Sequence, residues 1–138
     1  MSEENVEIVR RAFAAFQEGL LHGDPGAAYD TGLLADDAEW VTPGLMGGQS
    51  FIGRQGFAEF MRTWTEGFDG WDVQIERLID AGDDQVVGLF HQTATGKASR
   101  VPVELEQAVV YDLDGGRVVR MRNFLDRADA FEAAGLSH

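Results

Sequence analysis

Two amides and one carboxylate are the side chains whose types and spacing could do chemistry in this sequence. Gln107 and Asn123 fall on neighbouring segments in which apolar and polar residues alternate, so both amides face one apolar side. Each amide offers a donor and an acceptor, so the pair can hold a carbonyl or hydroxyl without a buried charge. We expect the two amides to touch or to share one water, bonding either each other or a ligand. Asp126 ends the last of these segments, as a catalytic base or as a helix cap.

The charged residues decide which way these segments face. Placing Gln107 and Asn123 inward sends Glu104, Glu106 and the arginines at 120 and 122 outward. A shift of one residue would bury those charges, which costs far more than burying two amides. The inward side chains then surround a pocket for a small molecule. We predict that it is lined by Trp40, Thr42, Met61, Trp64, Phe90, Gln92, Leu105, Gln107, Met121 and Asn123.

Other kinds of site find little support in the sequence. There are no cysteines, which excludes disulfides and thiolate chemistry. The three histidines are scattered without carboxylates at ligand spacing, so we expect no metal site. Gly47-Gly48 and Gly115-Gly116 lack the strand, helix and lysine context of a phosphate-binding loop. We therefore expect no cofactor.

Length and charge limit the classes of protein and partner. The chain has 138 residues, enough for a single domain spanning residues 1–138 with one core. Its net charge of −13 repels phosphate backbones and anionic membranes, so nucleic acid and membranes are not expected partners. No apolar run approaches the roughly 20 residues that cross a bilayer. The N-terminal segment is acidic where a signal peptide is basic, and we expect a cytoplasmic protein.

The elements that must position these residues follow from hydrophobic periodicity. Helices are predicted from Ser2 to about Leu20, from Asp24 to Leu34 and over Gly53–Phe68, with a short final helix after Asp126. Strands are predicted over Ala38–Thr42, Trp71–Ile79, Gln85–Gly96, Val101–Leu113 and Arg117–Asp126. This order predicts an α+β fold, a curved antiparallel sheet with the three N-terminal helices packed on its concave face.

The outward face of this sheet is mixed in character. Leu89, His91, Thr93, Ala108 and Val110 are placed there among charged neighbours. A monomer rarely leaves such a surface uncovered, so we expect a homodimer that pairs through the outer sheet face.

Several local motifs resemble one known family. They are Leu34-Ala35-Asp36-Asp37-Ala38-Glu39-Trp40, Gly53-Arg54-Gln55-Gly56-Phe57, Ala81-Gly82-Asp83-Asp84, Gly116-Arg117-Val118-Val119-Arg120 and Leu125-Asp126-Arg127. Over nearly its whole length the chain resembles the SnoaL-like branch of the NTF2-like superfamily. The resemblance implies a cystatin-like cone, a pocket between sheet and helices, and frequent dimerisation. It does not imply one activity, because this fold hosts isomerases, cyclases, hydrolases and non-catalytic binders.

The catalytic residues of these relatives are not matched here. By resemblance, the base of ketosteroid isomerase falls on Thr42, its acid on Gln107 and its tyrosine near Phe16. The His/Asp pair of the polyketide cyclases falls near Gln107 and Asn123, and amides do not titrate. We therefore expect a cone protein that binds a small apolar molecule. If it is an enzyme, we expect cofactor-independent chemistry of a polyketide-cyclase-like, isomerase-like or hydrolase-like kind, with Asp126 as base. The alternative is a non-catalytic dimerisation or accessory module with a residual pocket.

Overall fold

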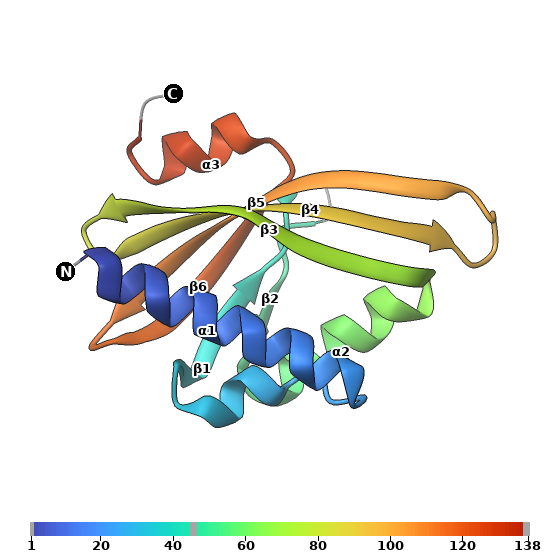
Figure 1. Cartoon of the computed structure of the whole chain (residues 1–138), viewed down its shortest axis with the longest axis horizontal. Helices are drawn as coiled ribbons and strands as arrows, with labels where there is room; N and C mark the ends of the chain where they lie inside the picture. The colour runs from blue at the N-terminus through green and yellow to red at the C-terminus, as the bar shows by residue number, and fades with distance from the viewer. Residues whose placement is uncertain (1, 45–46, 137–138) are drawn as a thin grey trace.

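The computed structural model describes residues 2–44 and 47–136, and places them in one open sheet with helices on both sides (Figure 1). The helical elements are α1 (Ser2–Leu21), η1 (Ala27–Thr31, a 3-10 helix), α2 (Gly53–Glu66) and α3 (Arg127–Ala133). The strands are β1 (Leu34–Val41), β2 (Ser50–Ile52), β3 (Phe68–Gly82), β4 (Gln85–Gly96), β5 (Pro102–Asp114) and β6 (Arg117–Phe124). They lie in the order β2-β1-β6-β5-β4-β3, so the predicted α+β class is confirmed. No helix in the described ranges is long and apolar enough to cross a membrane.

The four long strands form an antiparallel meander, as the alternating pattern predicts. β4 has the predicted bounds, and β5 and β6 differ from prediction only near their ends. β3 is longer than predicted, because it continues through three irregularities in its pairing with β4. Bulges of this kind add local twist and bend to a strand, so β3 follows the curvature of the sheet instead of ending.

The first part of the sheet differs from prediction. The second predicted helix shrinks to η1, because Gly32 takes a left-handed backbone (φ 79°) and the chain is extended from Leu34 onward. β1 runs parallel to β6, with Trp40 opposite Met121, so the sheet is mixed rather than wholly antiparallel. β2 is not among the predicted strands; its three residues pair with β1 and are too few to show a period.

The motif Gly53–Phe57 positions α2 over the sheet. Gly53 has a positive φ of 74°, and a Cβ on Gly56 would lie 3.3 Å from the backbone carbon of Phe51. Arg54 lies between two carboxylates, with Nη2 2.9 Å from Asp24 and 2.8 Å from Asp30. Its guanidinium lowers the pKa of Asp30 through their hydrogen bond. The glycines therefore allow α2 to start close to the sheet, while Arg54 ties it to the η1 region.

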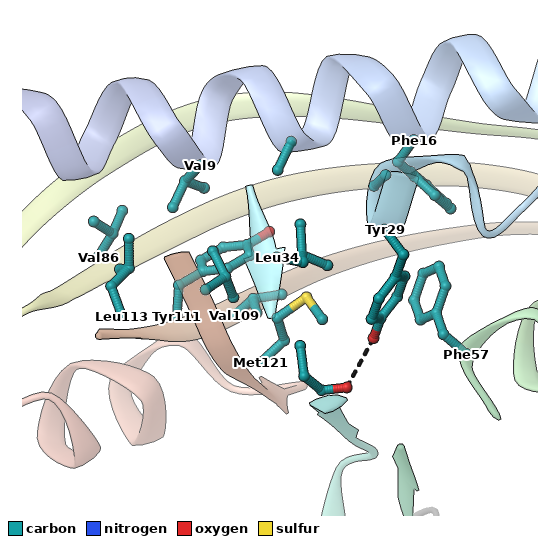
Figure 2. Packing of buried hydrophobic residues seen from close by; sticks show 14 of the residues in the cluster. Val9, Phe16, Tyr29, Leu34, Phe57, Val86, Val109, Tyr111, Leu113 and Met121 are labelled. Atoms are coloured by element: carbon teal, nitrogen blue, oxygen red, sulfur yellow. Dashed lines mark hydrogen bonds between the residues drawn. The ribbon is translucent and has the colours of Figure 1, made fainter. Parts of the chain in front are cut away.

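The helices are divided between the two faces of the sheet. α1, η1 and α2 share one core with the sheet, in which Val9, Phe16 and Phe57 pack with Val109 and Met121 (Figure 2). α3 lies on the other side, as Figure 1 shows. The prediction of three N-terminal helices is thus corrected to two α-helices and one 3-10 helix, while the short final helix predicted after Asp126 is present as α3.

α3 also changes the picture of the outer face. Leu89, Ala108 and Val110 do point outward, but they are only 8%, 0% and 0% exposed, because Ala130 of α3 and Ala134, directly after it, pack on them. The expectation that this apolar surface lies uncovered is wrong. A short helix after the sheet hides it within the same chain.

Candidate functional site

A cavity of about 100 Å³ lies between the sheet and the first two α-helices. A cavity on this scale can hold a few waters or a small ring. Of the residues predicted to line a pocket, Trp40, Met61, Trp64, Phe90, Gln92, Leu105, Gln107, Met121 and Asn123 line this one. Alternation along the strands and the helical stripe of α2 bring them to the same side of the sheet. That they contact a ligand stays a prediction.

Thr42 is not part of this cavity. β1 ends at Val41, so the alternation that placed Thr42 inward no longer applies there. Its hydroxyl accepts a hydrogen bond from the backbone N–H of Gln49 at 2.8 Å, and the side chain borders a separate hollow beside α2. The Thr42 side chain therefore bonds the backbone of Gln49 rather than lining the pocket.

Aromatic rings form much of the cavity wall. Six of them make a closed circuit in which successive ring centroids are 5.1–6.3 Å apart: Phe16, Phe57, Trp40, Phe60, Trp64 and Trp71. All three tryptophans of the chain belong to it. The sequence list omitted Phe16, Phe57, Phe60 and Trp71, although their helical spacing and strand alternation already turned them toward the core.

The polar side chains of the cavity form one hydrogen-bonded chain, here called the amide relay. Trp71 Nε1 donates to Gln92 Oε1 at 2.8 Å. Gln92 Nε2 donates to Gln107 Oε1, and Gln107 Nε2 donates to Asn123 Oδ1. Asn123 Nδ2 then donates to the Val41 carbonyl at 2.8 Å. The relay crosses β3, β4, β5, β6 and β1 in their order in the sheet, and the predicted contact between Gln107 and Asn123 is confirmed.

Both ends of the relay fix its direction. An indole N–H can only donate and a backbone carbonyl can only accept, so Trp71 and Val41 leave one orientation for the three amides between them. Each amide then uses its oxygen toward β3 and its nitrogen toward β1. The amides are held in place by one another before any ligand arrives.

The cavity lining carries almost no group that can titrate. Of the described residues that line it, only Tyr111 is ionisable, and burial raises the pKa of its phenol. The lining is therefore uncharged around neutral pH. Its polar groups can hydrogen-bond, but they have no proton to exchange at that pH.

Asp126 and His91 are not among the residues that line the cavity. Asp126 is exposed, and its Oδ1 accepts from the Ala128 backbone N–H at 2.8 Å as the N-cap of α3. His91 is on the outer face, 3.8 Å from Glu76 and 3.5 Å from Glu104. Within the described part of the chain, no group of three or more histidines and carboxylates is arranged to hold a metal.

Comparison with known proteins agrees with this architecture. The model of the SnoaL-like domain family matches residues 9–121. The chain belongs to the SnoaL-like family. No functionally curated protein matches the sequence significantly.

Several solved structures share the fold. Bal32a, from a soil-derived mobile gene cassette, is 26% identical, with TM-score 0.70 and 96% of each chain covered. An NTF2-like protein of unknown function from Burkholderia pseudomallei K96243 is 22% identical, with TM-score 0.72 and 96% of this chain and 97% of that one covered. TerC, co-crystallised with polyporic acid, is 20% identical, with TM-score 0.73 and coverage of 96% and 98%. The cone of the NTF2-like superfamily is thus this chain's architecture.

We expect the amide relay to contribute to the stability of this SnoaL-like protein. Gln107→Leu removes the middle of the relay and leaves an N–H of Gln92 and the oxygen of Asn123 unpaired. Each unpaired buried group costs about 1–3 kcal/mol, so we expect the free energy of unfolding to fall by about 2–6 kcal/mol in urea melts. Gln74→Leu is the matched control, because Gln74 is exposed on β3, and it should change stability by less than about 0.5 kcal/mol. Equal effects of the two changes would show that the relay does not hold the sheet.

Asp126 can be tested as a cap and as a base with two variants. Asp126→Ala removes the acceptor for Ala128 N–H and should lower the free energy of unfolding by about 1 kcal/mol. Asp126→Asn keeps a capping oxygen, so its unfolding midpoint should lie at nearly the same denaturant concentration as that of the wild type. A base is lost in both variants, so any turnover that disappears in Asp126→Asn at unchanged stability would identify Asp126 as that base. If neither variant were less stable than the wild type, the capping role would be contradicted.

Proposed function

We propose that the protein binds a small, uncharged, largely apolar molecule in the cavity between the sheet and α1 and α2. The observation that carries this proposal is the lining itself, in which aromatic and aliphatic side chains surround a relay of amides. Apolar pockets with a few placed polar groups are the usual form of small-molecule sites. The similar protein TerC was crystallised with polyporic acid, which supports the use of this cone for holding a small molecule.

The charge of the ligand follows from the cost of desolvation. An ion that entered the cavity would lose its water, and no described lining residue carries an opposite charge that could replace it. Anions are further disfavoured by the net charge of −13. A neutral ligand avoids both costs, because its burial releases water from apolar surface on both sides.

Any reaction in this cavity would need its base from beyond the described lining. Asp126 remains the proposed base for cyclase-, isomerase- or hydrolase-type chemistry without a cofactor, although its carboxylate caps α3. Binding requires no such group, and it is the function that the neutral lining supports best. A cytoplasmic location stays a prediction.

Three ligands of similar size test the proposal. α-Methylstyrene is neutral, whereas benzoate and benzylammonium carry a full negative or positive charge. We expect α-methylstyrene to bind and both ions to bind at least about tenfold more weakly, since each must enter without a countercharge. The fluorescence of the three tryptophans, all in the cavity wall, reports on occupancy. Tighter binding of either ion would contradict the proposal.

A pair of variants shows whether the binding is in the cavity. Leu105→Phe adds bulk to a half-buried lining residue and should weaken α-methylstyrene binding by about tenfold or more. Glu104→Phe puts the same side chain on the neighbouring, exposed position of β5, where it should leave the affinity unchanged. Equal effects would move the binding site outside the cavity.

We propose that a homodimer forms through the part of the outer sheet face that α3 leaves open, around Thr93. Light scattering should then report twice the mass of one chain at micromolar concentration. Thr93→Asp would place like charges across a two-fold axis and should give monomers. Leu21→Asp, at an 80% exposed position on α1, is the control and should stay dimeric. A wild-type monomer would contradict this arrangement.

A further inference from the structure

One hydroxyl in the cavity wall has no partner within the chain. Tyr111 lies on β5, two positions after Val109 and four after Gln107, so strand alternation places all three on the inner face. Its side chain lines the cavity, and no described residue makes a hydrogen bond with its hydroxyl. Buried polar groups are almost always paired, so this hydroxyl calls for an explanation.

The Tyr111 hydroxyl also has open space beside it. In the described residues, the buried side-chain atoms that lack a partner and have less than 1 Å² of accessible surface are Trp40 Nε1, Trp64 Nε1 and Arg127 Nε. The Tyr111 oxygen is not one of them, so it keeps accessible surface although the residue is only 7% exposed. Its cross-strand neighbours Val86 and Met121 are 0% and 6% exposed and close off the outside. The open surface at this oxygen therefore belongs to the cavity.

A second buried tyrosine provides the contrast. The Tyr29 hydroxyl donates to the Ala38 carbonyl at 2.8 Å, as Figure 2 shows, whereas no such bond reaches Tyr111. Burial raises the pKa of both phenols, so both keep their proton near neutral pH. Tyr29 uses its proton within the chain, and Tyr111 still has one to donate.

Tyr111 lies at the closed end of the cavity. Val109 and Val118, which line it there, are only 2% and 1% exposed. Leu105 and Gln107 are half-buried, so the cavity opens beside the amide relay. Tyr111 is four positions from Gln107, or about 13 Å along β5. A ligand that enters past the relay therefore brings its leading end toward Tyr111.

The type of ligand oxygen follows from counting protons. Apart from the relay and the sealed indoles of Trp40 and Trp64, Tyr111 is the only polar side chain among the described lining residues. A ligand hydroxyl would share one hydrogen bond with Tyr111, and one of the two protons would stay unpaired. A carbonyl oxygen brings no proton of its own, so a single bond pairs every donor. Unpaired buried donors are rarer in proteins than acceptors with a free lone pair.

We propose that the Tyr111 hydroxyl donates a hydrogen bond to a carbonyl oxygen at the leading end of the ligand, which is a neutral carbonyl compound with an apolar body. This inference rests on the proposed function and names the chemical class of its ligand. The apolar body packs against the aromatic rings of the wall, between Tyr111 and the relay.

Two variants test whether the hydroxyl is free in the protein without ligand. Tyr29→Phe loses the hydrogen bond to the Ala38 carbonyl, so its unfolding midpoint in urea should fall. Tyr111→Phe removes a group with no partner in the chain, so its midpoint should stay the same or rise. An equal fall in both variants would overturn the proposal, because the Tyr111 hydroxyl would then be bonded within the chain.

A ketone and its hydrocarbon isostere test the carbonyl. Acetophenone and α-methylstyrene share one ring and one methyl group, but the second has a CH₂ where the first has the oxygen. In Tyr111→Phe, the ratio of ketone affinity to hydrocarbon affinity, measured by calorimetry, should fall about tenfold, because the oxygen is then buried without a donor. Tyr29→Phe is the matched control and should keep the wild-type ratio. The ratio cancels effects of packing and stability that act on both ligands.

Two further measurements identify the bond and the oxygen. A hydrogen bond lowers the stretching frequency of a carbonyl, so ¹³C-carbonyl acetophenone should absorb at lower frequency in the wild type and in Tyr29→Phe than in Tyr111→Phe. The same frequency in all three proteins would overturn the hydrogen bond. 1-Phenylethanol, with a hydroxyl for the carbonyl, should bind the wild type about threefold more weakly than acetophenone. Tighter binding of the alcohol would overturn the carbonyl class.

The outcomes separate this inference from the proposed function. An affinity ratio unchanged in Tyr111→Phe would overturn the role of Tyr111, whose partner would then be water only, and would leave the apolar site standing. Binding of neither ligand would overturn both. A ratio that falls equally in Tyr29→Phe would also overturn the assignment, because the effect would then come from the core and not from the free hydroxyl.

Discussion

A buried amide must find hydrogen-bond partners, and in this protein three amides find them in one another across the sheet. The relay from Trp71 to the Val41 carbonyl joins the consecutive strands β3, β4, β5 and β6 to β1, which is distant from them in sequence. Because side chains alternate between faces, a slip of one residue in any of these strands would turn its relay member to the opposite face. The hydrogen bonds of the relay therefore help to fix the register of these strands, while burial of the apolar residues on the same face supplies the free energy of folding.

The same constraint separates the two faces of the sheet chemically. The inner face has polar groups that satisfy each other and only a phenol with a raised pKa, so it stays neutral. Charge is arranged on the other side, where Arg127 pairs with Glu76 at 3.1 Å and Glu106 at 3.2 Å. These ion pairs join the start of α3 to β3 and β5, and they remain partly in water, where their desolvation cost is small. An acidic protein can thus keep an uncharged cavity.

The sequence predicts well those features that follow from the alternation of apolar and polar residues along a strand. Alternation places Gln107 and Asn123 on the inner face, and the long strands β4, β5 and β6 come close to their predicted bounds. The sequence does not predict features that lack a local pattern. β2 has only three residues, too few to show a period, and the parallel pairing of β1 with β6 has no local signal. Thr42 is misplaced because alternation cannot show where a strand stops. The packing of α3 on Leu89, Ala108 and Val110 likewise depends on a contact that only the folded chain makes.

The candidate site shows a related limit on what residue types alone can say. Amides and indoles are both visible in the sequence, but which of them keep an open hydrogen-bonding position depends on how they pair after folding. Positions at which relatives are expected to carry titrating acids hold Gln107 and Asn123 here, and the structure uses these two as scaffold. Trp40 and Trp64, which look like ordinary core residues by composition, keep indole N–H groups without a hydrogen-bond partner among the described residues. Which polar groups stay free for a ligand in such a cone therefore depends on how its donors and acceptors pair after folding, and residue types alone do not show that pairing.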